Sequence, residues 1–425
     1  ERYEWINHSM APTKIENHDF RVTIGGEACT QPYSASVFNI SAMSFGAISP
    51  NAIRALNEGA RRGGFYHDTG EGSLSPYHRE NGGDIVWELG SGYFGACERA
   101  GVFSEARFTE KALLAQVKMI EIKLSQGAKP GHGGVLPAPK VTAEIAATRG
   151  VAIGEDCISP ARHSTFDTPE GLLHFIARLR ELSGGKPTGF KMALGHPWEW
   201  FGVAKAMRTT GILPDFIVVD GGEGGTGAAP LEFTDHVGVP LREALMIVHN
   251  TLVGLNLRDR IRIGAAGKVI TGVDVARTLA LGADWCNAAR GFMFALGCIQ
   301  SQSCHTDLCP TGVATQDPRR WKHMDVPDKA TRVRNFHENT LVALKELLQA
   351  AGLTHPSELG PEHLIRRVSS TEVRSLATLY KFVKPGELID GVGEHAVFQR
   401  FWNAARPDTF APPAEMLAWR TTKTR

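Results

Sequence analysis

The sequence lacks any hydrophobic run long enough to cross a membrane. Its longest apolar stretches, such as "FIVV" at residues 216–219, fall far short of the roughly 20 residues that a spanning helix needs. No charge of either sign dominates, because 46 lysines and arginines offset 45 acidic residues to give a net charge of +1. That balance gives no support for binding to nucleic acid or to an anionic membrane surface.

Cysteine is scarce, and no signal-peptide pattern is present at the start of the chain. The first residue is Glu1 rather than methionine, so we expect that an upstream segment is missing and that any membrane association depends on it. The seven cysteines are odd in number, and their spacing fits no disulfide scaffold. Reduced thiols are the rule in the cytosol, so we predict a cytoplasmic protein. Four cysteines stand alone and are predicted to be small core residues: Cys29, Cys97, Cys157 and Cys286.

Glycine is abundant, with 46 residues, and short apolar segments alternate with helical ones between Ser34 and Ala289. The apolar segments read as nearly continuous hydrophobic runs, which is typical of a parallel sheet buried on both faces. They are "SASVFNISAM", "GFYHDT", "VKMIEIKL", "EDCIS", "TGFKMAL", "DFIVVDG", "RIRIGAAG" and "ADWCNAA". Helical patterns such as 168–184 and 271–282 separate them and end at glycines suited to a helix terminus. Eight such units over roughly 250 residues predict an α/β protein with a (β/α)8 TIM barrel.

We expect three regions along the chain. They are a polar N-terminal lead-in at residues 1–33, the barrel at 34–320 with a cysteine-rich loop at 297–312, and a C-terminal helical and irregular extension at 321–425. Within the extension, residues 332–352 have the pattern of an amphipathic helix that ends at Gly352. A doubly wound sheet is the alternative fold. It predicts G-x-G-x-x-G after the first strand, and none is present there.

Glycine-rich segments follow several predicted strands, at 68–73, 126–134, 220–228 and 265–268. In a barrel, the loops at the carboxyl ends of the strands lie on one rim, where ligands bind. Glycines in such loops expose backbone N–H groups that can surround a phosphate. Ordinary tight turns are the alternative. The phosphate-binding candidates are Gly224, Gly225, Thr226, Gly227 and Gly267.

Several charged residues stand where a charge is costly or where the chain should turn. Lys191 lies within the apolar segment "GFKMAL", which predicts either a cation beside an electron-rich cofactor ring or a side chain that reaches solvent. Lys129 lies between glycines in "GAKPG", and with Lys123 and Arg149 it is a candidate anchor for a substrate carboxylate. Glu71, in "TGEGS", is a candidate acid–base or amine-holding group. A solvated surface charge is the alternative for Glu71, Lys129 and Arg149.

Three cysteines fall within twelve residues, in "GCIQSQSCHTDLCPTG": Cys298, Cys304 and Cys309. Thiolates bind soft metal ions and clusters, and three of them suit a three-iron cluster or a four-iron cluster with one open site. A Cys3His zinc site that includes His305 is the rival, but zinc loops use C-x2–4-C pairs, whereas the spacing here is C-x5-C-x4-C. Three core cysteines without a ligand are the remaining alternative.

Six segments resemble the FMN-binding synthase domain of the glutamate synthase family, in the family's order: "SAMSFGAIS", "TGEGS", "IKLSQGAKPGHGG", "DGGEGGTGAAPL", "LRDRIRI" and "CHTDLCPTGVATQ". The likeness is strong from about residue 34 to 320, and it extends furthest toward a short branch that lacks the glutaminase domain. The resemblance implies a barrel with FMN at its carboxyl-end rim and a [3Fe–4S] cluster on the three clustered cysteines. It also implies reduction of 2-iminoglutarate, formed from 2-oxoglutarate and ammonia, to L-glutamate, with electrons passed from the cluster to FMN.

The resemblance assigns a role to individual positions. Ala42, Met43 and Ser44 would lie along the flavin, with Gln126 and Lys191 at its ring. The full set implied to contact FMN is Ala42, Met43, Ser44, Gln126, Lys191, Gly224, Gly225, Thr226, Gly227, Gly267, Lys268, Ala289 and Arg290. The set implied for catalysis is Glu71 at the ammonia or imine end, Lys129 and Arg149 near 2-oxoglutarate, and Lys123 as a further active-site lysine.

Two departures from the family pattern bear on the substrate. Only about thirty residues precede the barrel, too few for a glutaminase domain, so the amine would be free ammonia, another amine or the product of a partner subunit. In addition, "GHGGVLPA" stands where the family often has "GEGGQLPG", so His132 replaces an acidic residue and Val135 a substrate-side glutamine. Val135 cannot hydrogen-bond a carboxylate. An N-methylglutamate synthase-type subunit, or a related reductase with another substrate, therefore stays open.

The source of the electrons is expected to be a partner. No NAD(P)H-binding fingerprint is visible, so ferredoxin or a reductase subunit is the expected donor, and other synthase subunits are further expected partners. An electron-transfer or redox-sensing subunit without turnover is the alternative from a different class. Glu71, Lys129 and Arg149 argue against it, because a relay does not need to bind a carboxylate.

Overall fold

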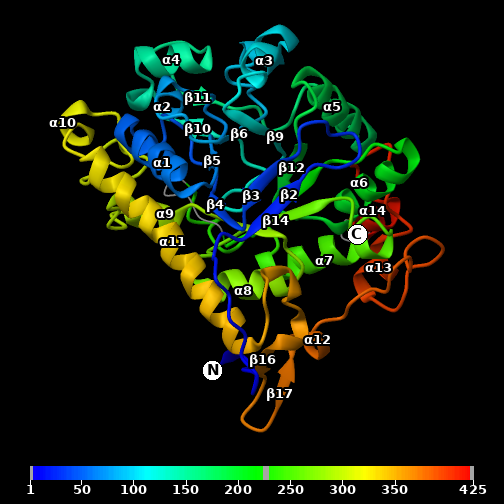
Figure 1. The fold of residues 1–425 in the computed structure, drawn as a ribbon. Helices are drawn as coiled ribbons and strands as arrows, with labels where there is room; N and C mark the ends of the chain where they lie inside the picture. The colour runs from blue at the N-terminus through cyan, green and yellow to red at the C-terminus, as the bar shows by residue number, and fades with distance from the viewer. Residues whose placement is uncertain (1–2, 224–228, 422–425) are drawn as a thin grey trace.

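The computed structural model describes residues 3–223 and 229–421, and its centre is a closed barrel of parallel strands (Figure 1). Neighbouring strands pair in parallel all the way round, in the order of the chain. The predicted (β/α)8 fold is therefore confirmed. The barrel strands are β4 (Phe38–Ile40), β5 (His67–Asp68), β6 (Ile85–Leu89), β9 (Val117–Lys123), β12 (Thr188–Met192), β13 (Phe216–Asp220), β14 (Arg262–Ala266) and β15 (Trp285–Ala288).

Helices surround the barrel (Figure 1), and their ends follow local sequence signals. Thr168 caps α5 by accepting a hydrogen bond from the backbone N–H of Gly171 at 3.0 Å. Thr271 and Asp274 form a capping box at the start of α8. The helices between strands are α1 (Pro50–Gly63), α2 (Pro76–Arg79), α3 (Glu105–Ala112), α4 (Ala143–Arg149), α5 (Pro169–Leu182), α6 (Pro197–Thr210), α7 (Leu241–Gly254) and α8 (Gly272–Ala280).

Three helices follow the last barrel strand: α9 (Arg290–Leu296), α10 (Pro318–Trp321) and α11 (Val326–Ala351). The long helix α11, yellow in Figure 1, packs along α1, α8 and α9. The helix predicted at 332–352 is confirmed, including its end at Gly352, where φ is 78°. It begins earlier than predicted because Asp325 caps it. No helix in the described part of the chain is both long enough and apolar enough to cross a membrane.

One predicted barrel strand is wrong, and one real strand was missed. The segment "EDCIS" contains β11 (Cys157–Ile158), which pairs antiparallel with β10 (Val135–Leu136) outside the barrel. Ile158 is 60% exposed, so no second layer covers it as a barrel strand requires. The third barrel strand is β6, whose buried Glu88 is compensated by Lys191 on β12, a partner that only the folded chain brings near. Two short strands lie between β6 and β9: β7 (Cys97–Arg99) and β8 (Val102–Phe103). A 3-10 turn (Ala138–Lys140) lies between β9 and β12.

The predicted polar lead-in contains strands that close the amino end of the barrel. In Figure 1 the paired strands β2 (Arg21–Ile24) and β3 (Tyr33–Ser36) cross this end. Ile24, Tyr33 and Ala35 are buried there against inward-facing barrel side chains, which include Tyr66, Val86, Met119, Phe216, Val218 and Trp285. Ligand access is therefore left to the opposite, carboxyl end.

The C-terminal extension returns to the start of the chain. Strand β1 (Glu4–Ile6) pairs with β16 (Leu364–Arg367), which pairs with β17 (Val373–Ser375) (Figure 1). The carboxylate of Glu4 forms ion pairs with Arg242, Arg277 and Arg366. The remaining elements are α12 (Leu376–Leu379), α13 (Ala396–Phe401), α14 (Ala414–Thr421) and two 3-10 turns (Pro356–Glu358 and Pro361–His363). Both terminal regions thus bind the barrel through specific contacts.

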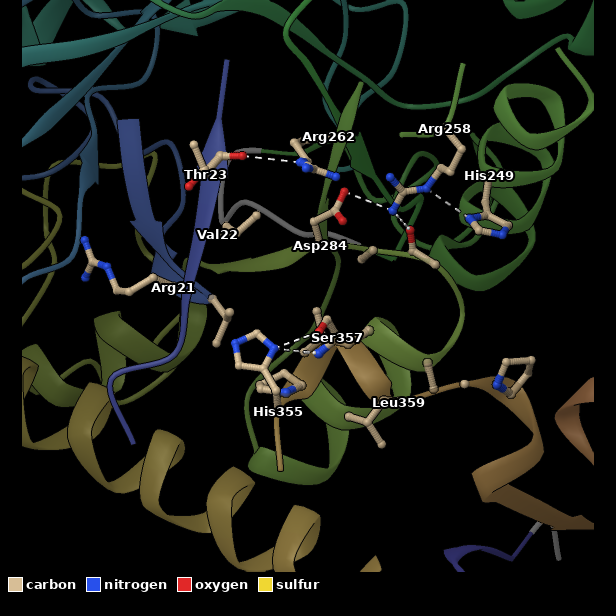
Figure 2. A pocket seen from close by; sticks show the side chains of 18 of the residues that line it. Arg21, Val22, Thr23, His249, Arg258, Arg262, Asp284, His355, Ser357 and Leu359 are labelled. Carbon is tan, nitrogen blue, oxygen red and sulfur yellow. Dashed lines mark hydrogen bonds and ion pairs between the residues drawn. The ribbon is translucent and has the colours of Figure 1, made fainter. Parts of the chain in front are cut away.

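A cleft of about 530 Å³ lies at the amino end, between the barrel and the segment before β16. Figure 2 shows that two of its cations, Arg258 and Arg262, are held by protein groups. Arg258 pairs with Asp284 at 2.9 Å and donates to Nδ1 of His249 at 3.3 Å, while Nε of Arg262 donates to the carbonyl of Thr23 at 3.3 Å. The cleft exceeds in volume the pockets at the opposite end, but two of its arginines are already engaged by groups of the barrel and of β2.

Candidate active site

Two adjoining pockets open at the carboxyl ends of the barrel strands. The larger has a volume of about 400 Å³ and the smaller about 80 Å³. They share four lining residues: Ala42 and Gln126 from the loops after β4 and β9, and Ala289 and Arg290 where β15 leads into α9. Together they form one site on the rim that the fold leaves open.

Every residue predicted to contact the cofactor, and described by the structure, lines one or both pockets. The larger pocket includes Met43 and Ser44, and the smaller includes Lys191, Gly267 and Lys268. The remaining candidates, Gly224, Gly225, Thr226 and Gly227, lie outside the described residues. The structure thus brings together side chains from loops separated by more than 240 positions in the sequence, from Ala42 to Arg290.

Glycines let these rim loops approach one another closely. Gly70 has φ of 63°, and a Cβ atom there would lie 2.7 Å from the backbone nitrogen of Ser44. A Cβ atom on Gly127 would lie 1.8 Å from the carbonyl oxygen of Gly221. A side chain at either position would push apart loops that form the pocket.

Glu71 and Lys123 form an ion pair in the larger pocket. Oε1 of Glu71 lies 3.2 Å from Nζ of Lys123, and the hydroxyl of Ser159 donates to Oε2 at 3.2 Å. Burial alone would raise the pKa of Glu71, but the positive charges of Lys123 and Arg149 outweigh burial and lower the pKa overall. The glutamate is therefore an ionised group that faces the pocket. His163, which contacts the Lys123 carbonyl at 2.9 Å, helps to fix this segment.

Lys129 and Arg149 lie behind the pocket wall rather than on it. Their exposed fractions are 5% and 4%, and neither is among the pocket-lining residues. Nη2 of Arg149 donates to the carbonyl of Phe45 at 2.8 Å, and its guanidinium lies over the ring of Phe94 at 5.4 Å. In this arrangement both cations act on the site through the positive potential that they create around Glu71.

Lys191 points into the barrel and not to solvent. It is 4% exposed, and its ammonium forms ion pairs with Glu88 and, at 3.5 Å, with Glu121. Because it also lines the smaller pocket, it presents a fixed positive charge at the pocket floor. The alternative of a solvent-reaching lysine is thereby excluded.

The cysteine-rich loop forms the outer wall of the larger pocket, which includes Cys298 and Cys304, while Cys309 is buried behind them. All seven cysteines of the chain are free thiols. Burial acts to raise the pKa of Cys309, but hydrogen bonds from the Thr311 hydroxyl and from the backbone of Ala314 lower it overall. These donors favour a thiolate at this position.

A single zinc ion does not fit the cysteine-rich loop as it is folded. Tetrahedral zinc with bonds of about 2.3 Å brings its thiolates within about 4 Å of one another. Among the described Cys, His, Asp and Glu side chains, the one group of three whose ligand atoms all lie within 4.8 Å is Asp68, Glu88 and Glu121, away from this loop. Each thiolate of an iron–sulfur cluster binds a different iron, so cluster ligands stand further apart than the ligands of one ion.

Lys140 is a further residue of this region that the sequence did not reveal. It is 2% exposed, and its ammonium donates to three carbonyls: Ala47 at 3.1 Å, Cys304 at 2.7 Å and Ala314 at 3.0 Å. Ala47 belongs to the loop after β4, and Cys304 to the cysteine-rich loop. Lys140 therefore joins the two halves of the larger pocket. Ser159, His163 and the acids around Lys191 were also missed, since none belongs to a recognisable motif.

The fold and the pockets define an α/β-barrel protein whose ligand site lies at the carboxyl ends of the strands. The chain belongs to the glutamate synthase family, since the family model described as "Conserved region in glutamate synthase" matches residues 7–354. The resemblance inferred from the motifs is thus confirmed.

Individual relatives agree with this assignment. The "Glutamate synthase large subunit-like protein YerD" of Bacillus subtilis is 40% identical over 385 residues, which cover 90% of this chain and 73% of the relative. An archaeal glutamate synthase (NADPH) of Methanocaldococcus jannaschii is 38% identical over 335 residues, 78% of this chain and 62% of that protein. The chain therefore spans less than two thirds of the length of the second relative.

Among solved structures, a flavocytochrome b2 variant with sulfite bound has a TM-score of 0.51 at 14% identity, and the match covers 92% of this chain and 82% of that chain. At this level of identity the likeness shows a shared barrel fold.

Proposed function

We propose that this protein is an oxidoreductase of the glutamate synthase type, which reduces an imine formed from a 2-oxo acid and an amine. The leading substrates are 2-oxoglutarate and ammonia, with 2-iminoglutarate as the species reduced and L-glutamate as the product. Family membership and the names of the relatives support the reaction type. The observation that carries the proposal is the single pocket shared by the loop after β4, the Glu71–Lys123 pair and the cysteine-rich loop.

FMN fits the paired pockets. Ala42 and Met43 offer an apolar wall for a planar ring, and Lys191 offers a positive charge beside it. Lys268 and Arg290 are cations at the mouth of the smaller pocket, where a phosphate would be held together with the loop at Gly267. Bound there, FMN supplies transfer of a hydride to the imine carbon.

A [3Fe–4S] cluster fits Cys298, Cys304 and Cys309. Three thiols face one region, hydrogen-bond donors surround Cys309, and the buried ammonium of Lys140 supplies positive charge nearby. A cluster bound there would supply electron transfer from a donor toward the pocket. We propose that this donor is a separate ferredoxin or reductase subunit, and that ammonia-supplying or other synthase subunits are further partners.

The protein's own residues hold the substrate and control its charge. Ionised Glu71 attracts the ammonium or iminium group, and Ser159 keeps its carboxylate in place. Lys123 is positioned to bind a substrate carboxylate, or to donate a proton as ammonia adds to the 2-oxo group. Lys129 and Arg149 add the positive potential that favours a doubly negative 2-oxo acid in the pocket.

A methylated amine is the second candidate substrate, as in N-methylglutamate synthesis. Val135, which is 36% exposed, lines the larger pocket together with Leu136 and Pro137. This apolar wall can receive a methyl group at no cost in hydrogen bonds. In both candidates the acid–amine chemistry at Glu71 is the same.

The test is anaerobic reoxidation of the photoreduced protein, followed at the flavin and cluster absorption bands. One sample receives 2-oxoglutarate with ammonia, another 2-oxoglutarate with methylamine, and a third 2-oxoglutarate alone. Rapid reoxidation with formation of glutamate or N-methylglutamate supports the proposal and identifies the amine. Stable reduced flavin in all three samples contradicts 2-oxoglutarate as the substrate.

A further inference from the structure

Five ionisable side chains meet inside the barrel beneath the smaller pocket. They come from consecutive strands of the barrel wall: Asp68 on β5, Glu88 on β6, Glu121 on β9, Lys191 on β12 and Asp220 on β13. Asp68, Glu88 and Glu121 are each 1% exposed, and one carboxylate oxygen from each lies within 4.8 Å of the others. We call these four acids and Lys191 the barrel acid cluster.

The barrel acid cluster has too many acids for its one cation. Lys191 contacts Glu88 and Glu121, which leaves Asp68 and Asp220 without a direct ion pair in the described residues. If all four acids were ionised, the cluster would carry a net charge of −3. Buried charge without a partner is costly, so acids in such a place retain protons.

Hydrogen bonds distinguish the members of the cluster. Asp68 accepts from the backbone N–H of Gly70 at 3.0 Å, and Asp220 from that of Gly127 at 2.9 Å. Oε1 of Glu121 accepts no hydrogen bond in the described structure; the Lys191 ammonium lies 3.5 Å from it, and Glu121 has carboxylate oxygens of Asp68 and Glu88 within 4.8 Å. An acid with two acidic neighbours and an oxygen that accepts no hydrogen bond is strongly stabilised by a proton.

The expected charge states agree with this geometry. Burial, and then the charge of Asp68, raise the pKa of Glu121 well above its ordinary value. Burial and the charge of Glu88 raise the pKa of Asp68 to about 7, and burial also raises that of Asp220.

Two further titratable groups act on the barrel acid cluster from its surroundings. The Tyr66 hydroxyl interacts with the charges of Glu121 and Asp68, and it is fixed by bonds to Asn287 at 2.6 Å and Trp285 at 2.8 Å. The Lys123 ammonium acts on Asp220. Burial raises the pKa of the Tyr66 phenol, so it stays neutral near pH 7, and Glu121 and Asp68 are left as the groups that hold protons.

We propose that Glu121 and Asp68 are proton-holding residues of the active site: Glu121 carries a resident proton, and Asp68 takes up a further proton when two electrons arrive in the pocket that Lys191 lines. The second part rests on the proposed function, with FMN as the electron acceptor. Two electrons and one proton delivered to FMN bound there would add one negative charge to the pocket. Asp68 would balance this charge by taking a second proton from water, so the pocket region gains no net charge. Asp68 would return that proton to water when the flavin is oxidised again.

Two measurements test the two parts. Infrared spectra of the wild type and of Glu121→Gln, both as purified, are subtracted from each other in the region where protonated carboxyl groups absorb. We expect a carboxyl band that is present in the wild type and absent from Glu121→Gln. A pH-indicator dye in weakly buffered, anaerobic solution reports the protons taken up per two electrons during photoreduction at pH 7 to 8. We expect more than one proton in the wild type and one proton in Asp68→Asn. The control for both is Glu199→Gln, which removes a partly buried carboxyl on α6, outside the cluster.

Each outcome has one meaning. A carboxyl band that persists unchanged in Glu121→Gln overturns the resident proton. Equal proton uptake in the wild type and in flavin-loaded Asp68→Asn overturns the second proton. A wild type that retains no FMN overturns the proposed function and the uptake by Asp68 with it, whereas the infrared band is read without any cofactor. If Glu121→Gln does not fold, loss of the band in Glu121→Ala gives the same answer.

Discussion

Replacing Lys140 by methionine should separate the two halves of the active-site pocket. The ammonium donates to the carbonyls of Ala47, Cys304 and Ala314 at 3.1, 2.7 and 3.0 Å. Methionine fills a similar volume but donates nothing, so three carbonyls lose their donor. At about 1 kcal/mol for each, the free energy of unfolding should fall by about 3 kcal/mol.

The position of Lys140 makes a second effect specific to the cysteine-rich loop. The variant loses the cation that donates to the Cys304 carbonyl, and a cluster on the three thiolates would lose the positive charge that acts on Cys304 and Cys309. We therefore expect iron and sulfide content to fall severalfold after anaerobic purification or reconstitution. Because the residues proposed to contact FMN are unchanged, FMN should still bind.

The matched control is Lys186→Met. Lys186 is 5% exposed and donates to the carbonyls of Ala112 and Leu114, at the opposite end of the barrel. By the same reasoning, the free energy of unfolding of Lys186→Met should fall by about 2 kcal/mol, and this variant should keep its iron. Chemical denaturation measures the stability of both variants, and iron analysis measures their iron content. Equal iron content in the two variants, with equal loss of stability, would refute a specific role for Lys140.

Three further predictions concern the pocket and the response to pH. Glu71→Gln keeps the shape of the side chain but removes the charge that faces the pocket, so turnover should fall by on the order of 10²-fold or more with FMN binding unchanged, as stopped-flow reoxidation will show. Val135→Gln adds a donor to the pocket wall and should lower the KM for 2-oxoglutarate by roughly tenfold, whereas an unchanged KM would place the substrate carboxylate elsewhere. His67 is fully buried, and burial lowers its pKa from 6.5 to about 3, so below pH 6.5 the unfolded chain binds a proton that the folded chain does not. As the pH falls from 6.5 to 3, this difference in proton binding lowers the free energy of unfolding by about 1.4 kcal/mol per pH unit. In His67→Phe the free energy of unfolding should therefore fall less steeply over this range.

Much of the fold followed from the sequence because its signals are local. Strands such as β13, with the sequence FIVVD, are buried on both faces and therefore read as continuous apolar runs. Caps such as Thr168 and Gly352 mark helix ends through bonds within a few residues. The third barrel strand escaped detection because Glu88 breaks its apolar pattern, and the ion pair that permits this lies about one hundred positions away on β12.

The candidate site was predictable where it consists of motif segments. The loop after β4, Gln126, Lys191 and the three clustered cysteines were found from their sequence context, and the structure places the described cofactor candidates around two joined pockets. Ser159, His163 and Lys140 were not found, because a serine, a histidine and a lysine in a loop carry no periodic or motif signal. Their roles depend on the residues that they meet.

The sequence by itself determined the barrel, the family and the chemical types of the site residues, since those depend on local pattern and motif. The tertiary structure decided which charges face the pocket and which lie behind it. It placed Arg149 against Phe45 and Phe94, joined the cysteine-rich loop to the loop after β4 through Lys140, and gathered four acids around Lys191. The physical reason is that the energy of a buried charge depends on distance to partners from other strands, and only the closed barrel fixes those distances.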